Sequence, residues 1–153
     1  MKIPISVLVV IYKLNGDVLL IERADRTGFW QSVTGSLDAL DEDLALAAAR
    51  EVFEETGILV DQLPNDALQN MHHHIEYQIY PEWRFRYAPG VTSNTEHWFA
   101  LQVPNDTQVK LAPREHVAYD WLSYIEAAKK CFSPSNGEAI LKLFSEKKNK
   151  KER

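Results

Sequence analysis

Residues 50 to 57 read Arg50-Glu51-Val52-Phe53-Glu54-Glu55-Thr56-Gly57. Three of these residues are glutamates spaced three and four positions apart, so on a helix they project from one face. Like charges at that spacing repel by ~0.2–0.5 kcal/mol per pair, and a bound cation would offset the repulsion. Mg²⁺ prefers oxygen ligands, and it usually keeps several coordinated waters while it binds one or two carboxylates and the phosphates of a substrate. The octapeptide therefore predicts a metal-binding helix, and a solvated acidic helix face is the alternative.

The flanking sequence predicts a helix over residues 41–56. Strong helix formers fill this segment, and Asp41 or Asp43 can cap its first turn. Gly57 stands where a glycine commonly ends a helix. An apolar stripe is expected at three positions that lie four residues apart, Leu44, Ala48 and Val52.

The pattern around the acids resembles the Nudix box. In that motif a glycine is followed after five residues by Glu, and after seven more by Arg-Glu, an aliphatic residue, any residue, Glu-Glu, any residue, Gly and an aliphatic residue. From Glu42 to Ile58 the chain keeps this register, but six residues instead of five separate Gly35 from Glu42. Either the loop carries an insertion, or Asp41 fills the first acidic place.

The Nudix resemblance implies an α/β fold, a Nudix α/β/α sandwich with a mixed sheet and a catalytic loop–helix–loop. We expect residues 1–153 to form a single Nudix hydrolase domain, with residues 146–153 as a mobile basic tail. The resemblance also implies hydrolysis of a phosphoanhydride bond with Mg²⁺, or Mn²⁺ in its place. Metal would be held directly or through water by the acidic residues of the helix.

Several stretches over residues 2–144 resemble a narrower group, the bacterial dihydroneopterin triphosphate diphosphatases of folate biosynthesis. These stretches are residues 4–12, 29–36 and 86–92, together with Asn94-Thr95-Glu96, Glu115-His116, Ala118-Tyr119 and Trp121-Leu122. Enzymes of this group release pyrophosphate from dihydroneopterin triphosphate and leave the monophosphate.

Carried over residue by residue, this resemblance implies a set of site residues. The implied metal ligands are Glu51, Glu55 and Glu115, and the implied catalytic residues are Glu54, Glu115 and Arg50. Glu115 would act as a ligand or as a base on water. The implied substrate contacts are Lys2, Arg23, Thr34, Tyr77, Tyr80 and Ser133. Lys2 and Arg23 would pair with phosphate oxygens, whereas core packing is an equal alternative to ring stacking for Tyr77 and Tyr80.

The rest of the chain predicts strands separated by few helices, hence a mixed sheet. We expect strands over residues 5–12, 17–22, 30–33, 58–60, 75–80, 96–103 and 117–122. We expect a short helix over 123–130 and a final helix after the capping box Ser135-Asn136-Gly137-Glu138, with Ile140, Leu141 and Phe144 facing inward. The run His72-His73-His74 is interpreted as an exposed loop, because adjacent side chains rarely converge on one ion. The tryptophans Trp30, Trp83, Trp98 and Trp121 are interpreted as core or interface residues.

Composition limits the classes of function. With 45% apolar and 25% charged residues, the 153-residue chain is typical of a soluble domain. Residues 146–153 carry five basic and two acidic groups, so the net charge of −5 becomes −8 on the rest of the chain. An acidic body repels polyphosphates unless a cation screens it.

Partners and location follow from the same composition. We expect a small-molecule triphosphate as partner, no nucleic acid, no membrane, and a monomer or homodimer. No apolar run reaches the ~18–20 residues that span a bilayer, and Cys131, the single cysteine, cannot form an internal disulfide. We therefore expect a cytoplasmic protein with an inert thiol. Alternative functions are a broader nucleoside triphosphate or dinucleoside polyphosphate hydrolase, and a Nudix-fold domain that binds its ligand without cutting it.

Overall fold

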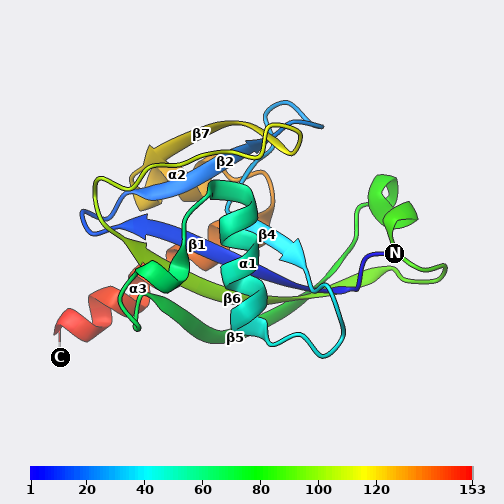
Figure 1. The fold of residues 1–153 in the computed structure, drawn as a ribbon, viewed down its shortest axis with the longest axis horizontal. Coiled ribbons are helices and arrows are strands. Elements are labelled where there is room, and N and C mark those ends of the chain that lie inside the picture. The colour runs from blue at the N-terminus through cyan, green and yellow to red at the C-terminus, as the bar shows by residue number, and fades with distance from the viewer. Residues whose placement is uncertain (153) are drawn as a thin grey trace.

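The computed structural model describes the backbone of residues 1–152 and the side chains of residues 1–149. The chain folds into one mixed sheet between helices (Figure 1). The strands are β1 (Ile5–Lys13), β2 (Val18–Arg23), β3 (Trp30–Gln31), β4 (Val33–Ser36), β5 (Leu68–Gln78), β6 (Ser93–Val103) and β7 (His116–Leu122). The helices are α1 (Leu44–Thr56), α2 (Tyr124–Lys130) and α3 (Pro134–Glu152), with the short 3₁₀ helices η1 (Val60–Gln62) and η2 (Pro81–Arg86). Within residues 1–152 no helix is long and apolar enough to cross a bilayer.

β1 is the centre of the sheet. It pairs in parallel with β6 along its whole length, and on its other edge it pairs antiparallel with β4 and with the end of β2. The main strand order is β3-β2-β1-β6-β5, with β7 beside β2. Seven consecutive residues of β1, from Ser6 to Tyr12, are buried, which explains the almost unbroken apolar sequence of this strand.

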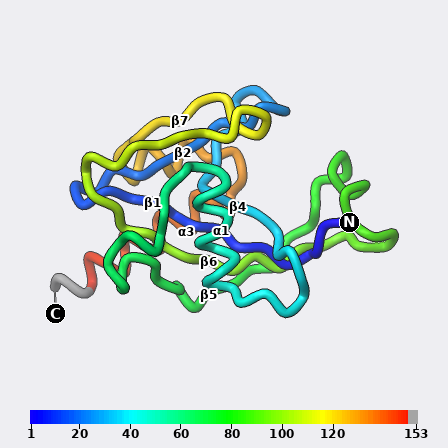
Figure 2. The backbone as a smooth tube through the Cα atoms, viewed as in Figure 1, coloured from blue at the N-terminus to red at the C-terminus, as the bar shows by residue number. Residues whose placement is uncertain are grey.

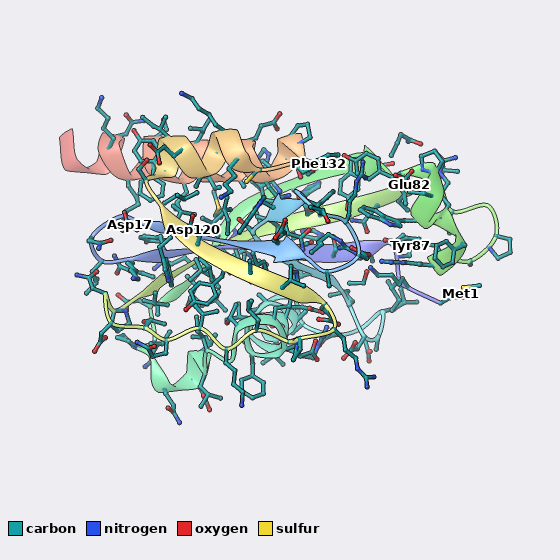
Figure 3. The ribbon with its side chains drawn as sticks, turned by 90° about the horizontal axis from the view of Figure 1, so that it is seen from above. Met1, Asp17, Glu82, Tyr87, Asp120 and Phe132 are labelled. Carbon is teal, nitrogen blue, oxygen red and sulfur yellow. The ribbon has the colours of Figure 1, made fainter. Side chains whose placement is uncertain are left out.

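Helices cover both faces of the sheet, with α1 on one face and α2 and α3 on the other (Figure 3). Alternate residues of β1 feed two cores. Val7 and Val9 pack with Ala48 and Val52 of α1, whereas Leu8 and Val10 pack in the cluster that contains Ala139 and Ile140 of α3. This arrangement confirms the expected sandwich with a mixed sheet.

Two expectations between residues 58 and 80 are wrong. Residues 58–60 form no strand, because the chain leaves α1 through Gly57 and turns into η1. His72, His73 and His74 lie within β5, which begins at Leu68, and not in a loop. β5 is an edge strand whose residues alternate in exposure. Its pairing register with β6 is irregular near His72, which has a φ of 53°. This irregularity interrupts the regular pairing at the histidine run, where the sequence shows no clear strand pattern.

The C-terminal helix also differs from the expectation. It begins at Pro134, so Ser135 lies inside its first turn and does not cap it. Proline favours the first helical position because its amide has no hydrogen to leave unpaired. Ile140 is buried and Phe144 partly so, but Leu141 is 48% exposed, and Leu143 takes the inward position instead. α3 continues to Glu152, so most of the basic segment is helical, while its mobility stays a prediction.

Candidate active site

Glu51 and Glu55 are buried on the side of α1 that faces β4, and Gly35 of β4 makes room for Glu51. The two glutamates are 9% and 3% exposed. A Cβ atom at Gly35 would overlap the carboxylate of Glu51. Asp43 caps α1 through Leu46 N, and Gly57, at φ 75°, ends it in the left-handed conformation, so the phase of both acids is fixed.

Arg50 holds the acidic residues of the loop and helix together. Its Nε and Nη2 donate to the two oxygens of Glu42 at 2.9 and 3.0 Å, and Nη1 donates to Glu51 Oε1 at 2.9 Å. It also contacts Glu54 at 3.3 Å and the carbonyl oxygen of Ser36 at 3.1 Å. Glu42 is therefore paired with Arg50, and Asp41 is exposed and outside this network. A planar fork of donors suits such a set of acceptors.

The pKa values of Glu51 and Glu55 are both raised by burial. For Glu55 the adjacent Glu51 and the charge of Glu115 add to the rise in pKa. Glu55 Oε1 has no hydrogen-bond partner, and His116 Nε2 lies 3.7 Å from it. Burial lowers the pKa of His116 to about 4, so the imidazole is neutral and does not compensate the acids.

These carboxylates fit a divalent cation. Two buried, mutually repelling acids with an unpartnered oxygen are a costly arrangement without one. Among the described side chains no group of three or more His, Cys, Asp or Glu residues is gathered closely enough to hold a metal ion, so a cation at the Glu51–Glu55 pair would need further ligands. Both acids line an open cleft of about 970 Å³, the acidic cleft, together with Glu54 and Glu115.

Four cationic side chains line the acidic cleft, namely those of Lys2, Arg23, Arg86 and Arg114. Lys2, Arg23 and Arg86 lie close enough together for their charges to interact. A backbone hydrogen bond from Lys2 N to Arg86 O of 2.8 Å fixes the N-terminal segment against the end of η2 (Figure 2). Burial lowers the pKa of Lys2, and the charges of Arg86 and Arg23 lower it further. Asp25 pairs with Arg23 at 2.7 Å and only partly offsets this positive charge. An anion such as a phosphate would relieve the repulsion.

A second cavity of about 330 Å³, the aromatic pocket, opens from the same place. Its aromatic wall consists of Phe29, Tyr80 and Trp83. The ring centroid of Trp83 lies 5.6 Å from that of Phe29 and 5.4 Å from that of Tyr80. The two cavities share seven residues, Lys2, Arg23, Gln31, Thr34, Gly35, Ser36 and Arg86. One continuous site therefore runs from an apolar, aromatic end past a cationic middle to an acidic end.

The NUDIX domain profile matches residues 2–143 of this chain. The chain belongs to the Nudix family. It is 44% identical to the dihydroneopterin triphosphate diphosphatase of Escherichia coli K12 over 142 residues, which cover 91% of each protein. It is 39% identical to the enzyme of that name from Haemophilus influenzae, over 90% of this chain and 85% of the relative.

Solved structures agree with these matches. The Escherichia coli dihydroneopterin triphosphate pyrophosphohydrolase superposes on the chain with a TM-score of 0.82 and 45% sequence identity, covering 91% of this chain and 93% of that one. This Nudix protein is therefore a hydrolase that acts on diphosphate bonds.

The residues expected to contact substrate converge in this Nudix protein. All six line the aromatic pocket: Lys2, Arg23, Thr34, Tyr77, Tyr80 and Ser133. Glu54 and Glu115 line the acidic cleft, whereas Arg50 lies behind it and reaches the site through Glu51.

Five residues that line the site were not expected from the sequence to have a role in function. These are Phe29, Trp83, Arg86, Asn94 and Glu96. Trp83, which was expected in the core or at an interface, is only partly buried and lies in the pocket wall. All of them except Trp83 lie in the stretches that resemble the dihydroneopterin triphosphate diphosphatases. Those stretches could therefore have pointed to these residues as members of the site.

Proposed function

We propose that this protein hydrolyses dihydroneopterin triphosphate to dihydroneopterin monophosphate and pyrophosphate, as in folate biosynthesis, with Mg²⁺ as cofactor. The observation that supports this most is the continuous site, whose aromatic pocket and acidic cleft meet at Lys2, Arg23 and Arg86. A flat ring would occupy the pocket while its triphosphate passes the cations to reach the acids. The two curated relatives named for this reaction support the same substrate.

Glu51, Glu55 and Glu115 would hold the metal ion in this proposal. The first two are buried beside Gly35, and Glu115 approaches from the turn before β7, outside α1. When bound, Mg²⁺ or Mn²⁺ neutralises phosphate charge and lowers the pKa of a coordinated water. The raised pKa values of Glu51 and Glu55 mean that both acids bind a cation in competition with protons.

The remaining residues position the reaction and accept its proton. Glu115 or Glu54 would take the proton of the attacking water, whose oxygen bonds to phosphorus as the bridging P–O bond breaks and pyrophosphate leaves. Arg50 acts through Glu51 and Glu42 as a positioning residue. Lys2 and Arg23 would hold phosphate oxygens, and Thr34, Tyr77, Tyr80 and Ser133 would line the ring site.

A substrate panel tests the proposal. Pyrophosphate release is measured with Mg²⁺ or with EDTA on dihydroneopterin triphosphate, dATP, dGTP and a dinucleoside tetraphosphate. The expected result is Mg²⁺-dependent release with the highest kcat/KM on dihydroneopterin triphosphate. A higher kcat/KM on a nucleotide would instead identify the protein as a broader nucleotide hydrolase. Saturable binding of a compound without release of pyrophosphate would instead identify it as a binding module.

We further propose a cytoplasmic monomer or homodimer that takes small triphosphates and neither nucleic acid nor membrane. The net charge of −8 on residues 1–145 opposes binding to polyanions away from the cationic site. Sedimentation of the purified protein, with and without a DNA duplex at low salt, tests the oligomeric state and the absence of nucleic-acid binding. Co-sedimentation with the duplex would contradict this part of the proposal.

A further inference from the structure

The floor of the aromatic pocket carries a buried carboxylate, that of Glu96 on β6. Its side chain lines the pocket, although the residue is only 2% exposed. Trp98 Nε1 donates to Glu96 Oε1 at 3.0 Å, and the nearby hydroxyl of Ser135 lowers the pKa of the carboxyl group. No Lys, Arg or His among the described side chains forms an ion pair with Glu96. A carboxylate offers about four acceptor positions, and the hydrogen bond from Trp98 uses one of them.

Asn94, two residues earlier on the same face of β6, supplies a further acceptor. It is 1% exposed and lines the same pocket. Its Nδ2 donates to Ser6 Oγ at 2.7 Å and to the hydroxyl oxygen of Tyr77 at 3.2 Å, which fixes the orientation of the amide. Its Oδ1 has no hydrogen-bond partner. A buried acceptor without a partner costs ~1–3 kcal/mol, so a ligand that donates here would be favoured.

The pocket therefore combines a wall for a flat ring with a floor of acceptors. Phe29, Tyr80 and Trp83 offer aromatic surface, and a volume of about 330 Å³ suits one ring system. Burial raises the pKa of Glu96, while the hydrogen bond from Trp98 and the hydroxyl of Ser135 oppose that rise. Donors from a ligand would act in the same direction as these two groups.

We propose that Glu96, assisted by Asn94, selects the substrate by accepting two adjacent N–H donors from the 2-amino-4-oxopyrimidine edge of a bicyclic ring. This inference rests on the proposed function, because it assigns the ring-recognition residue of the same site. The 2-amino group and the neighbouring ring N–H are parallel donors that one carboxylate takes together. Adenine places an acceptor nitrogen beside its amino group, so it satisfies only part of this floor.

A purely structural role for Glu96 is the competing explanation. Glu96 is buried and accepts a hydrogen bond from Trp98, so its replacement could act on stability alone. A structural role would lower stability and reduce the rates on all substrates alike. A recognition role changes the preference between substrates, and the two explanations are therefore separated by a ratio of kcat/KM values.

The first test compares Glu96→Gln with the control Glu76→Gln. Gln keeps the shape and the acceptor for Trp98, but it replaces a carboxylate oxygen with a donor that opposes the ligand donors. Glu76 is exposed on β5, hydrogen-bonded to Ser93 at 2.9 Å and outside the pocket. We expect Glu96→Gln to lower the ratio of kcat/KM for dihydroneopterin triphosphate over dATP by about 10- to 100-fold. The control keeps the wild-type ratio, and an unchanged ratio in Glu96→Gln overturns the inference.

The second test needs no variant and stands even if Glu96→Gln does not fold. Wild-type enzyme is given an analogue of dihydroneopterin triphosphate in which oxygen replaces the 2-amino group. A drop in kcat/KM of at least tenfold supports the inference, and equal kcat/KM values overturn it. If wild-type enzyme releases no pyrophosphate from dihydroneopterin triphosphate at all, the proposed function fails, which is a different result from an unaltered substrate preference.

Discussion

Replacing Gly35 with Ala should displace Glu51, which we propose as a metal ligand. Gly35 lies in β4 opposite Val7 and does not have a positive φ, so alanine fits its backbone conformation. The added methyl group would overlap the Glu51 carboxylate, which is buried and held by Arg50 at 2.9 Å. The perturbation is therefore steric and acts on one side chain.

The magnitude follows from crowding in a packed site. Overpacking of this kind costs ~1–3 kcal/mol of unfolding free energy. For a chain of this length each kcal/mol corresponds to about 2–4 °C in Tm, so the metal-free variant should melt roughly 2–12 °C lower. A displaced ligand should weaken Mg²⁺ binding and kcat/KM by about 10- to 100-fold, comparable to the loss of a group that orients a ligand.

A double-mutant cycle isolates the contact. Denaturant unfolding in EDTA is measured for wild type, Gly35→Ala, Glu51→Ala and the double variant, and Mg²⁺ dependence of activity for wild type and Gly35→Ala. In the Glu51→Ala background the methyl group meets no carboxylate, so Gly35→Ala should be neutral, or stabilising by ~0.4–1 kcal/mol through the unfolded state. An equal penalty in both backgrounds would refute the reasoning.

Three further predictions concern single side chains. Glu55→Gln should reduce kcat by at least about 100-fold with an unchanged fold by circular dichroism, because a buried acid that we propose as a metal ligand loses its charge; an unchanged kcat would remove Glu55 from the mechanism. Arg50→Lys should raise the Mg²⁺ concentration needed for half-maximal activity about tenfold, because lysine cannot pair in two places with Glu42 while holding Glu51; an unaltered Mg²⁺ titration would contradict this. Burial raises the pKa of Cys131 to about 12, so its thiol stays neutral at pH 8 and should react with iodoacetamide more slowly in native than in unfolded protein. Cys131→Ser should keep full activity, and a loss of activity would identify Cys131 as a nucleophile.

The periodicity of the sequence predicted α1 and its acidic face well. Helical spacing is local, so Glu51, Glu54 and Glu55 had to share a helix surface, and Gly57 had to end it. The same reasoning placed β1 and β6 within three residues of their observed bounds. It was wrong for residues 58–60 and for the His72-His73-His74 run, where short segments have no strong period.

The chain's own sequence thus determined an acidic helix, an apolar central strand and the motif of the family, because each depends on neighbours along the chain. The tertiary structure alone decided that Glu42 pairs with Arg50, that Glu54 stays half exposed, and that Glu115 comes beside Glu55. It also brought Arg86 against Lys2 and set Glu96 under the aromatic pocket. These contacts arise from pairing between strands and loops distant in sequence, such as β1 with β6, and no local pattern of side chains encodes that pairing.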